Sequence, residues 1–355
     1  MGTPTSETPA LGPDDRRSRV DRARLLANVR KNLFGSTFEE PRIGRYILRQ
    51  RLASGAMGQI HLAFDPRLRR EVALKVLRCA SPSEAAVVAR EAQAIAKLDL
   101  HEVVRVFDVG HSEHGLFIAM ERLHGTTYER WVREHSPSGA TRLDTLEQVA
   151  RGLAGAHRAG VIHRDVKPKN VMVEPDGRVV LVDFGLATEL ERPDGPGVDG
   201  VVGTPAYMAP EQHRGEHASP AADQYAWCVM AWESLYGSRP FVETSADSLL
   251  AEKLRSTLRE SPPSPRVTRG VHRVLLRGLA AQPTARWPSM DALLLALQHA
   301  RSRGRRLVLW GSVAAVGGAA LTYALASTPS AERCPTPGAG RRPSARPTGS
   351  RRGRR

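Results

Sequence analysis

Short apolar runs separated by polar and glycine-containing segments make up the part of the chain that follows residue 43. Five of these runs have the length and the aliphatic, β-branched or aromatic content of strands, namely 46–52, 59–64, 71–77, 103–109 and 116–121. One segment with helical spacing, 83–98, lies between the third run and the fourth. The pattern predicts a small lobe, residues 44–124, built from five antiparallel strands and one helix.

Beyond Gly125 the apolar positions take the spacing of amphipathic helices. The predicted helical segments lie near 126–135, 142–160, 220–236, 245–259, 270–281 and 289–303. No internal repeat is visible. A strand-rich lobe followed by a larger helical lobe, residues 125–300, predicts an α+β fold.

The two ends of the chain differ in composition from the part between them. Residues 1–43 mix Thr, Pro, Ser and charged side chains, which predicts a flexible leader. Residues 307–326 have no charged side chain over twenty positions, and as a helix they would be about 30 Å long, the thickness of a bilayer core. Residues 327–355 are rich in Pro, Gly and Arg and predict a basic, disordered tail.

Two interpretations fit the uncharged run 307–326. It is either a buried terminal helix of the preceding domain or a transmembrane helix. Gly311, Gly317 and Gly318 would weaken a helix in water, and the run has no polar face to turn toward solvent. The sequence therefore favours a single transmembrane helix.

The formal net charge of +15 raises the question of nucleic-acid binding. Twelve Arg and only one acidic residue, Glu332, lie from residue 301 to the end, so the predicted globular part is nearly neutral. A nucleic-acid footprint should lie on the folded domain, so no nucleic-acid partner is expected. Three widely separated Cys suggest neither a disulfide framework nor a zinc site.

A glycine-containing turn between the first two predicted strands is a candidate phosphate-binding loop. Its residues are Leu52, Ala53, Ser54, Gly55, Ala56, Met57, Gly58, Gln59 and Ile60. Glycine lets a backbone approach phosphate oxygens without a Cβ in the way, although two glycines three apart are also common in plain hairpins. The following strand ends in Lys75, and an inward-pointing lysine needs a carboxylate. Glu91 on the predicted helix 83–98 is the natural candidate.

Three further motifs follow in the larger lobe. Residues 161–173 read VIHRDVKPKNVMV, residues 181–185 read LVDFG, and residues 209–211 read APE. Together with the glycine loop and Lys75, their type, order and spacing resemble the protein kinase family over about 44–300. The segment GTPAYMAPEQ, 203–212, resembles bacterial Ser/Thr kinases in particular, and similar bacterial kinases often carry a membrane helix after the kinase domain.

The resemblance implies the two-lobed protein kinase fold and assigns the catalytic roles. Asp165 would orient the attacking hydroxyl and Lys167 would neutralise the γ-phosphate as it moves. Asn170 and Asp183 would bind Mg²⁺ through oxygen atoms. Lys75, held by Glu91, would bind the α- and β-phosphates of ATP.

The resemblance also assigns the remaining ATP and substrate contacts. Ile60, Ala73 and Met172 would enclose the adenine, with Glu121 to Leu123 at its edge and Met120 behind it. The segment from Gly203 through the APE motif would receive a peptide. Glu211 with Arg286 and Asp223 with the HRD turn would be structural contacts of the helical lobe.

These assignments predict a membrane-tethered serine/threonine protein kinase that uses ATP and Mg²⁺ and acts on Ser and Thr hydroxyls of proteins. Its kinase domain would be cytoplasmic, where ATP is, and homodimerisation is left open. Ala53 replaces the first glycine of the family's phosphate loop and should stiffen it. The alternative is a pseudokinase that acts as a membrane-tethered scaffold, but Lys75, Asp165 and Asp183 are all present.

Overall fold

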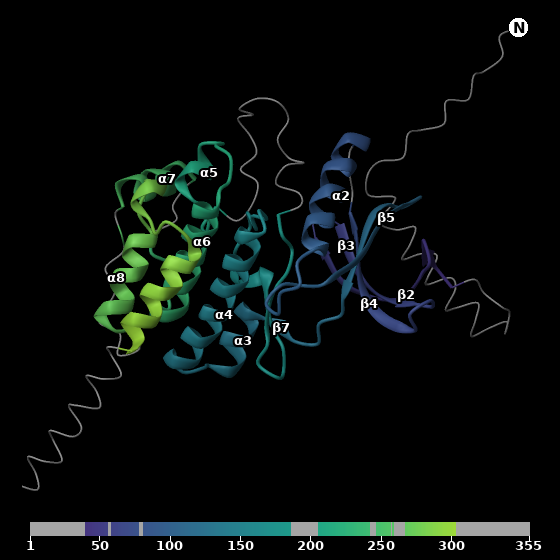
Figure 1. Cartoon of the computed structure of the whole chain (residues 1–355), viewed down its shortest axis with the longest axis horizontal. Coiled ribbons are helices and arrows are strands. Elements are labelled where there is room, and N and C mark those ends of the chain that lie inside the picture. Colours follow the sequence, from purple (N-terminus) through teal and green to yellow (C-terminus); the bar gives the residue numbers. More distant parts are fainter. Residues whose placement is uncertain are drawn as a thin grey trace, which may run out of the picture. The chain divides into compact units, whose positions relative to one another are not determined.

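The computed structural model describes residues 40–55, 58–77, 81–185, 205–241, 246–256, 258 and 267–302. Within these ranges one lobe holds the larger sheet and helix α2, and a second lobe holds the other helices and a small second sheet (Figure 1). This is the α+β, two-lobed architecture that the sequence predicts. Nearly all of the predicted leader, together with the run 307–326 and the tail 327–355, lies outside the described residues.

The small lobe is an antiparallel sheet in which the strands are ordered β1-β2-β3-β4-β6-β5. The strands are β1 (Arg42–Ile43), β2 (Tyr46–Gly55), β3 (Gly58–Asp65), β4 (Arg70–Leu77), β5 (Val106–Ser112) and β6 (Gly115–Glu121). The five predicted strands are present. A sixth, the two-residue β1, pairs with β2 and lies within the residues predicted as leader.

Strand β4 shows how the alternation of side chains builds two faces of this sheet. Val72 and Leu74 point into one apolar cluster with Tyr46. Ala73 belongs to a different cluster, on the opposite face of the sheet. Successive residues of a strand point to opposite faces, so Ala73 and Lys75 share the second face.

Helix α2 (Pro82–Ala96) is the only helix of the small lobe among the described residues. It starts at a capping box, in which the Ser81 side chain accepts from the Glu84 backbone N–H and Glu84 accepts from that of Ser81. Its buried residues Ala85, Val88, Ala92 and Ile95 recur at three- and four-residue steps and pack against the sheet. Glu91 therefore sits on a helix whose start and orientation are both fixed.

Strand β5 begins three residues later than predicted because residues 102–104 pair with the other lobe. Val104 donates to the Leu181 carbonyl at 3.0 Å, and Leu181 donates to the Glu102 carbonyl at 2.8 Å. The apolar residue Val103 is buried there, which explains why its sequence pattern reads as strand.

The larger lobe is built around two buried helices, α4 (Gly139–Arg158) and α6 (Pro220–Tyr236). Trp227 of α6 is fully buried and donates through Nε1 to the Leu146 carbonyl of α4 at 3.0 Å. Around them lie α3 (Tyr128–His135), α5 (Pro210–His213), α7 (Ala246–Arg255), α8 (Arg269–Gly278), a helix over 290–302, and the 3-10 turns η1 (Pro168–Asn170) and η2 (Pro283–Ala285).

A second, three-stranded sheet lies in this lobe and was not predicted. Its strands are β7 (Thr126–Thr127), β8 (Val171–Val173) and β9 (Val179–Leu181), in the order β7-β8-β9. Strands of two or three residues are too short to show alternation in a sequence. Their position matters because β8 ends the motif segment 161–173 and β9 leads into the motif segment 181–185.

Candidate active site

The candidate phosphate loop is the hairpin between β2 and β3. Gly55 pairs with Gly58, and the tip between them, Ala56 and Met57, lies outside the described residues. Gly58 has φ 149, and a Cβ there would lie 2.0 Å from the Val76 carbonyl oxygen. Only glycine fits that position. Ala53 pairs with Ile60 and is exposed, so its methyl group displaces nothing.

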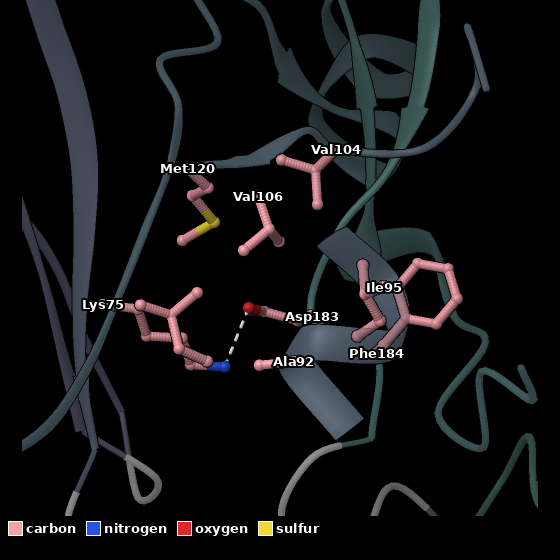
Figure 2. Close-up of a pocket in the computed structure, with 9 residues that line it drawn as sticks. Lys75, Ala92, Ile95, Val104, Val106, Met120, Asp183 and Phe184 are labelled. Atoms are coloured by element: carbon pink, nitrogen blue, oxygen red, sulfur yellow. Dashed lines mark hydrogen bonds and ion pairs between the residues drawn. The ribbon is translucent and has the colours of Figure 1, made fainter. Parts of the chain in front are cut away.

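Lys75 lies on the second face of β4 and is 6% exposed. Its Nζ donates to Asp183 Oδ1 at 2.9 Å. Figure 2 shows the two side chains pointing toward each other and joined by this contact. Both border a small cavity of about 20 Å³. The cavity is lined by Lys75, Ala92, Ile95, Val104, Val106, Ile118, Met120, Asp183 and Phe184.

The predicted pairing of Lys75 with Glu91 is wrong for this structure. Glu91 instead accepts a hydrogen bond from Arg164 Nη1 at 2.5 Å, and both side chains are largely buried. Arg164 has a left-handed backbone, with φ 67. Each partly buried cation needs a carboxylate, and the observed pairing satisfies Lys75 and Arg164 with one carboxylate apiece.

Asp165, Lys167 and Asn170 form one hydrogen-bonded group. Lys167 Nζ lies 2.6 Å from Asp165 Oδ2. Asn170 Nδ2 donates to the same oxygen at 2.8 Å and to the Asp165 carbonyl at 2.9 Å. Among the described residues, both side-chain hydrogen bonds to the Asp165 carboxylate therefore end on Oδ2.

A residue of α6, Asp223, holds the turn that carries Asp165. Asp223 accepts from the backbone N–H groups of His163 and Arg164, each at 2.7 Å, and lies 2.8 Å from His157 Nε2. The expected contact between Asp223 and the HRD turn is thus present. Burial lowers the pKa of His163, although Asp223 and Asp165 act in the opposite direction, so its ring is neutral and packs on Phe184 with centroids 4.4 Å apart.

Asp183 lies two residues after the end of β9 and has φ 55, a left-handed conformation that is uncommon outside glycine. Two backbone hydrogen bonds tie this segment to the Asp165 turn: Val182 donates to Asn170 at 3.0 Å, and Gly185 donates to His163 at 2.7 Å. Strands β8 and β9 pair side by side, so Asn170, just before β8, and Asp183, just after β9, lie at the same end of the hairpin.

These two residues suit a magnesium ion. Because the Asn170 amide nitrogen donates to Asp165, its amide oxygen faces away from that contact, and the Asp183 carboxylate is a third exposed. Mg²⁺ is bound by one or two protein oxygens together with phosphate and water. Among the described residues no three His, Cys, Asp or Glu side chains gather as they would for an all-protein metal site.

The residues assigned to the adenine belong to one apolar cluster. Ala73, Val104, Met120 and Val180 are buried in it, with Ile60, Leu123, Met172 and Val182 packed against them. The structure thus brings together, beside Lys75, the residues predicted to enclose the adenine, namely Ile60, Ala73 and Met172.

Glu121 has a second partner that the sequence did not indicate. Burial would raise the pKa of its carboxyl group, but hydrogen bonds from Arg178 and from the Arg105 backbone outweigh this and lower it. Arg178 donates through two nitrogens, at 2.8 and 3.0 Å. Arg178 lies on the turn between β8 and β9, so this pair joins the end of β6 to the second sheet. No motif contains Arg178, and its role appears only in three dimensions.

The APE segment is anchored in the core of the larger lobe. Glu211 accepts from Arg286 Nη1 at 2.6 Å and from Nη2 at 2.7 Å, and both side chains are buried. The predicted pair is therefore present. Residues 186–204 lie outside the described residues, and they include Gly203 and Thr204 at the start of the segment expected to receive a peptide.

No helix among the described residues is long and apolar enough to cross a membrane. The predicted transmembrane run, 307–326, is outside those residues.

Comparison with known proteins agrees with this geometry. The protein kinase domain family model matches residues 46–296. Serine/threonine-protein kinase PknL of Mycobacterium tuberculosis is 36% identical over 214 residues, which are 59% of this chain and 54% of PknL. Serine/threonine-protein kinase PknA of the same organism is 34% identical over 261 residues, 70% of this chain and 61% of PknA. PrkC of Bacillus subtilis, also a serine/threonine-protein kinase, is 31% identical over 256 residues, 70% of this chain and 39% of PrkC.

Among solved structures, the kinase domain of PknI from Mycobacterium tuberculosis matches with a TM-score of 0.54 and 26% identity. The match covers 75% of this chain and 99% of that domain. The chain spans about half the length of the curated relatives that it matches.

Proposed function

This chain belongs to the protein kinase domain family, and on that basis we propose that it is a serine/threonine protein kinase that transfers the γ-phosphate of ATP to Ser and Thr hydroxyls of proteins. The observation that carries the proposal is the group of three side chains, Asp165, Lys167 and Asn170, placed beside the pair Lys75–Asp183. Phosphoryl transfer needs positioning and charge compensation, and these five side chains supply both.

Each of these residues has a task that its surroundings support. Lys167 and Asn170 hold the Asp165 carboxylate through hydrogen bonds to Oδ2. Oδ1 would then accept a hydrogen bond from the hydroxyl group of the substrate. The Lys167 ammonium lies 2.6 Å from Asp165 Oδ2, and from there it would offset the charge of the moving phosphoryl group. Lys75 provides a fixed cation for the α- and β-phosphates.

Asn170 and Asp183 are the residues that would hold Mg²⁺. When bound, the ion supplies positive charge to the phosphate oxygens. The protein's contribution is to hold the amide oxygen of Asn170 and the carboxylate of Asp183 at one end of the β8–β9 hairpin. The Asp165 turn is hydrogen-bonded to Asn170 and to Gly185, two residues after Asp183.

The choice of Ser and Thr rests on two observations. The curated relatives carry the name serine/threonine-protein kinase. In this chain Lys167 takes part in the Asp165 group, as the resemblance to Ser/Thr kinases implies. The pseudokinase alternative has no support in these residues, because every assigned catalytic side chain is present.

The test is transfer of labelled phosphate by the full-length chain, purified in mild detergent, from ATP and Mg²⁺ to a generic basic protein, followed by phosphoamino-acid analysis. We expect phosphoserine and phosphothreonine, and no transfer by Asp165→Asn. Wild-type chain that binds ATP but transfers nothing would establish the pseudokinase, and phosphotyrosine as the main product would refute the substrate class.

The location of the protein is part of the same proposal. The uncharged run 307–326 would tether the kinase domain to a membrane, with the domain on the cytoplasmic side, where ATP is present. The Arg residues at 301–306 favour that orientation, although eight further Arg follow residue 327. Membrane fractionation and protease protection of the domain test it, and cross-linking in the membrane tests for a homodimer.

A further inference from the structure

Lys253 is a fully buried lysine that no motif explains. It lies on α7 and has an exposed fraction of 0%. The chain has 52 basic residues and only six of them are lysines, so Lys253 is unusual both in type and in burial. An ammonium group is placed in a protein interior only where it has polar partners, because burial without them costs several kcal/mol.

The partners of Lys253 are backbone carbonyls of the segment that precedes α5. Its Nζ donates to the Pro205 carbonyl at 2.6 Å and to the Met208 carbonyl at 2.8 Å. It also lies 6.0 Å from the centre of the Tyr225 ring, whose other neighbours include the Arg286 guanidinium. Helix α7 thus reaches the segment from its buried side, next to the anchored Glu211–Arg286 pair; the two helices α5 and α7 are neighbours in Figure 1.

His213 is a further neighbour of Lys253. Its Nε2 is 3.1 Å from Lys253 Nζ and 3.1 Å from the Pro205 carbonyl oxygen. Burial and the neighbouring ammonium lower the pKa of His213 to about 4, so the ring is neutral near pH 7. An ammonium only donates, and the neutral ring therefore accepts its hydrogen bond through Nε2.

A second contact holds the same segment from another side. Tyr207 donates to Glu233 of α6 at 2.5 Å, and its neighbours Ala206 and Ala209 are buried. The backbone from Pro205 to Ala209 is therefore fixed by a helix on each side: α6 through a side chain, and α7 through two carbonyl oxygens. These carbonyls cannot be paired by a strand or helix, because the segment forms neither.

We propose that Lys253 is a positioning residue for the protein substrate: it fixes the backbone of residues 205–208, the described part of the segment that receives a peptide, and so determines how tightly peptide binds. The inference rests on the proposed kinase function. Lys253 touches neither ATP nor the Asp165 group among its described contacts, so its effect falls on peptide binding and not on phosphoryl transfer itself.

The test is the variant Lys253→Met, which keeps the length of the side chain and removes its donors. We expect the KM for a Ser-containing peptide to rise on the order of tenfold, as the loss of charge-assisted hydrogen bonds would cause, with kcat changed by less than about threefold. The KM for ATP in peptide-independent ATP hydrolysis should stay unchanged. Arg255→Met is the matched control, because it removes one positive charge from the exposed end of the same helix.

Every outcome decides the matter. An unchanged peptide KM in Lys253→Met would overturn the proposal. So would a parallel loss of peptide phosphorylation and of ATP hydrolysis, or an unfolded variant, because Lys253 would then support the whole lobe. If Arg255→Met raised the peptide KM by the same factor, the effect would be due to the loss of one positive charge and not to the contacts of Lys253, and the proposal would be overturned. A wild-type chain with no phosphoryl transfer would instead refute the proposed function and can be told apart from all of these.

Discussion

Lys75 Nζ and Asp183 Oδ1 are 2.9 Å apart, so the cation assigned to the phosphates and the carboxylate assigned to the metal form one ion pair. The lysine side chain is 7% exposed and the aspartate 33%, so the pair is exposed to solvent mainly at Asp183. The next layer around them is apolar, lined by Ala92, Ile95 and Phe184. In the proposed function, nucleotide and metal would meet this pair at Asp183, the more exposed of the two side chains.

Lys75→Met should reduce kcat by about a hundred- to a thousandfold without unfolding the protein. The methionine fills the same volume beside an apolar cavity, while the cation that acts on the phosphates is lost. Steady-state phosphorylation of a basic protein measures the loss, and thermal melting checks the fold. Lys97→Met, at an exposed helix end, is the matched control. Wild-type rates in Lys75→Met would contradict the site assignment.

Asp165→Asn should remove transfer and leave ATP binding unchanged within about twofold. The amide keeps the shape of the side chain but no longer provides a carboxylate to orient the attacking hydroxyl. A fluorescent nucleotide titration alongside the rate separates binding from chemistry. Loss of nucleotide affinity together with the rate would show that Asp165 supports the nucleotide pocket instead of the reaction.

The sequence predicts the two lobes well because their elements are long and their apolar positions periodic, as in α2 and α4. It fails at Val103, where a buried residue of irregular chain resembles strand, and at β7 to β9, which are too short to show a period. The physical information that decides these cases is pairing with distant residues such as Leu181.

The candidate site shows the same division. Spacing within a motif finds Asp165, Lys167 and Asn170, because they lie on one turn. Spacing cannot decide which cation pairs with Glu91, since Lys75 and Arg164 come from different segments and both lie near α2. Arg178 and Lys253 belong to no motif, and only their burial and their distant partners single them out.

Breaking the Glu211–Arg286 pair should destabilise the larger lobe. Both side chains are nearly fully buried and joined by two hydrogen bonds, so Glu211→Gln leaves an uncompensated buried guanidinium. The expected loss is about 3–5 kcal/mol of unfolding free energy, measured by urea denaturation. Asp291→Asn is the control: its pair with Arg158 is exposed, so the change should cost less than about 1 kcal/mol. Equal losses in the two variants would mean that burial is not the cause.

The stability of the domain should fall between about pH 6.5 and pH 4 because of His213. Its pKa is lowered to about 4 by burial and by the Lys253 ammonium, whereas an unfolded His titrates near 6.5. Between these two pH values His213 is protonated in the unfolded chain and neutral in the folded chain. The free energy of unfolding therefore decreases as pH falls through this range. The stability that depends on a neutral His213 is fully present only above the range.

The size of this effect can be isolated with one variant. From pH 7 to pH 5 we expect His213 to account for a loss of about 2 kcal/mol at most, obtained as the difference in urea unfolding between wild type and His213→Gln, which retains polar contacts but does not titrate. The buried Trp227 and Trp232 provide the fluorescence signal. His299→Gln, at an exposed position of the helix 290–302, should leave the pH dependence of wild type unchanged. If His213→Gln loses stability between pH 7 and pH 5 as steeply as wild type does, burial and the Lys253 ammonium do not keep His213 neutral, and the hydrogen bond that His213 accepts from Lys253 would have to be abandoned.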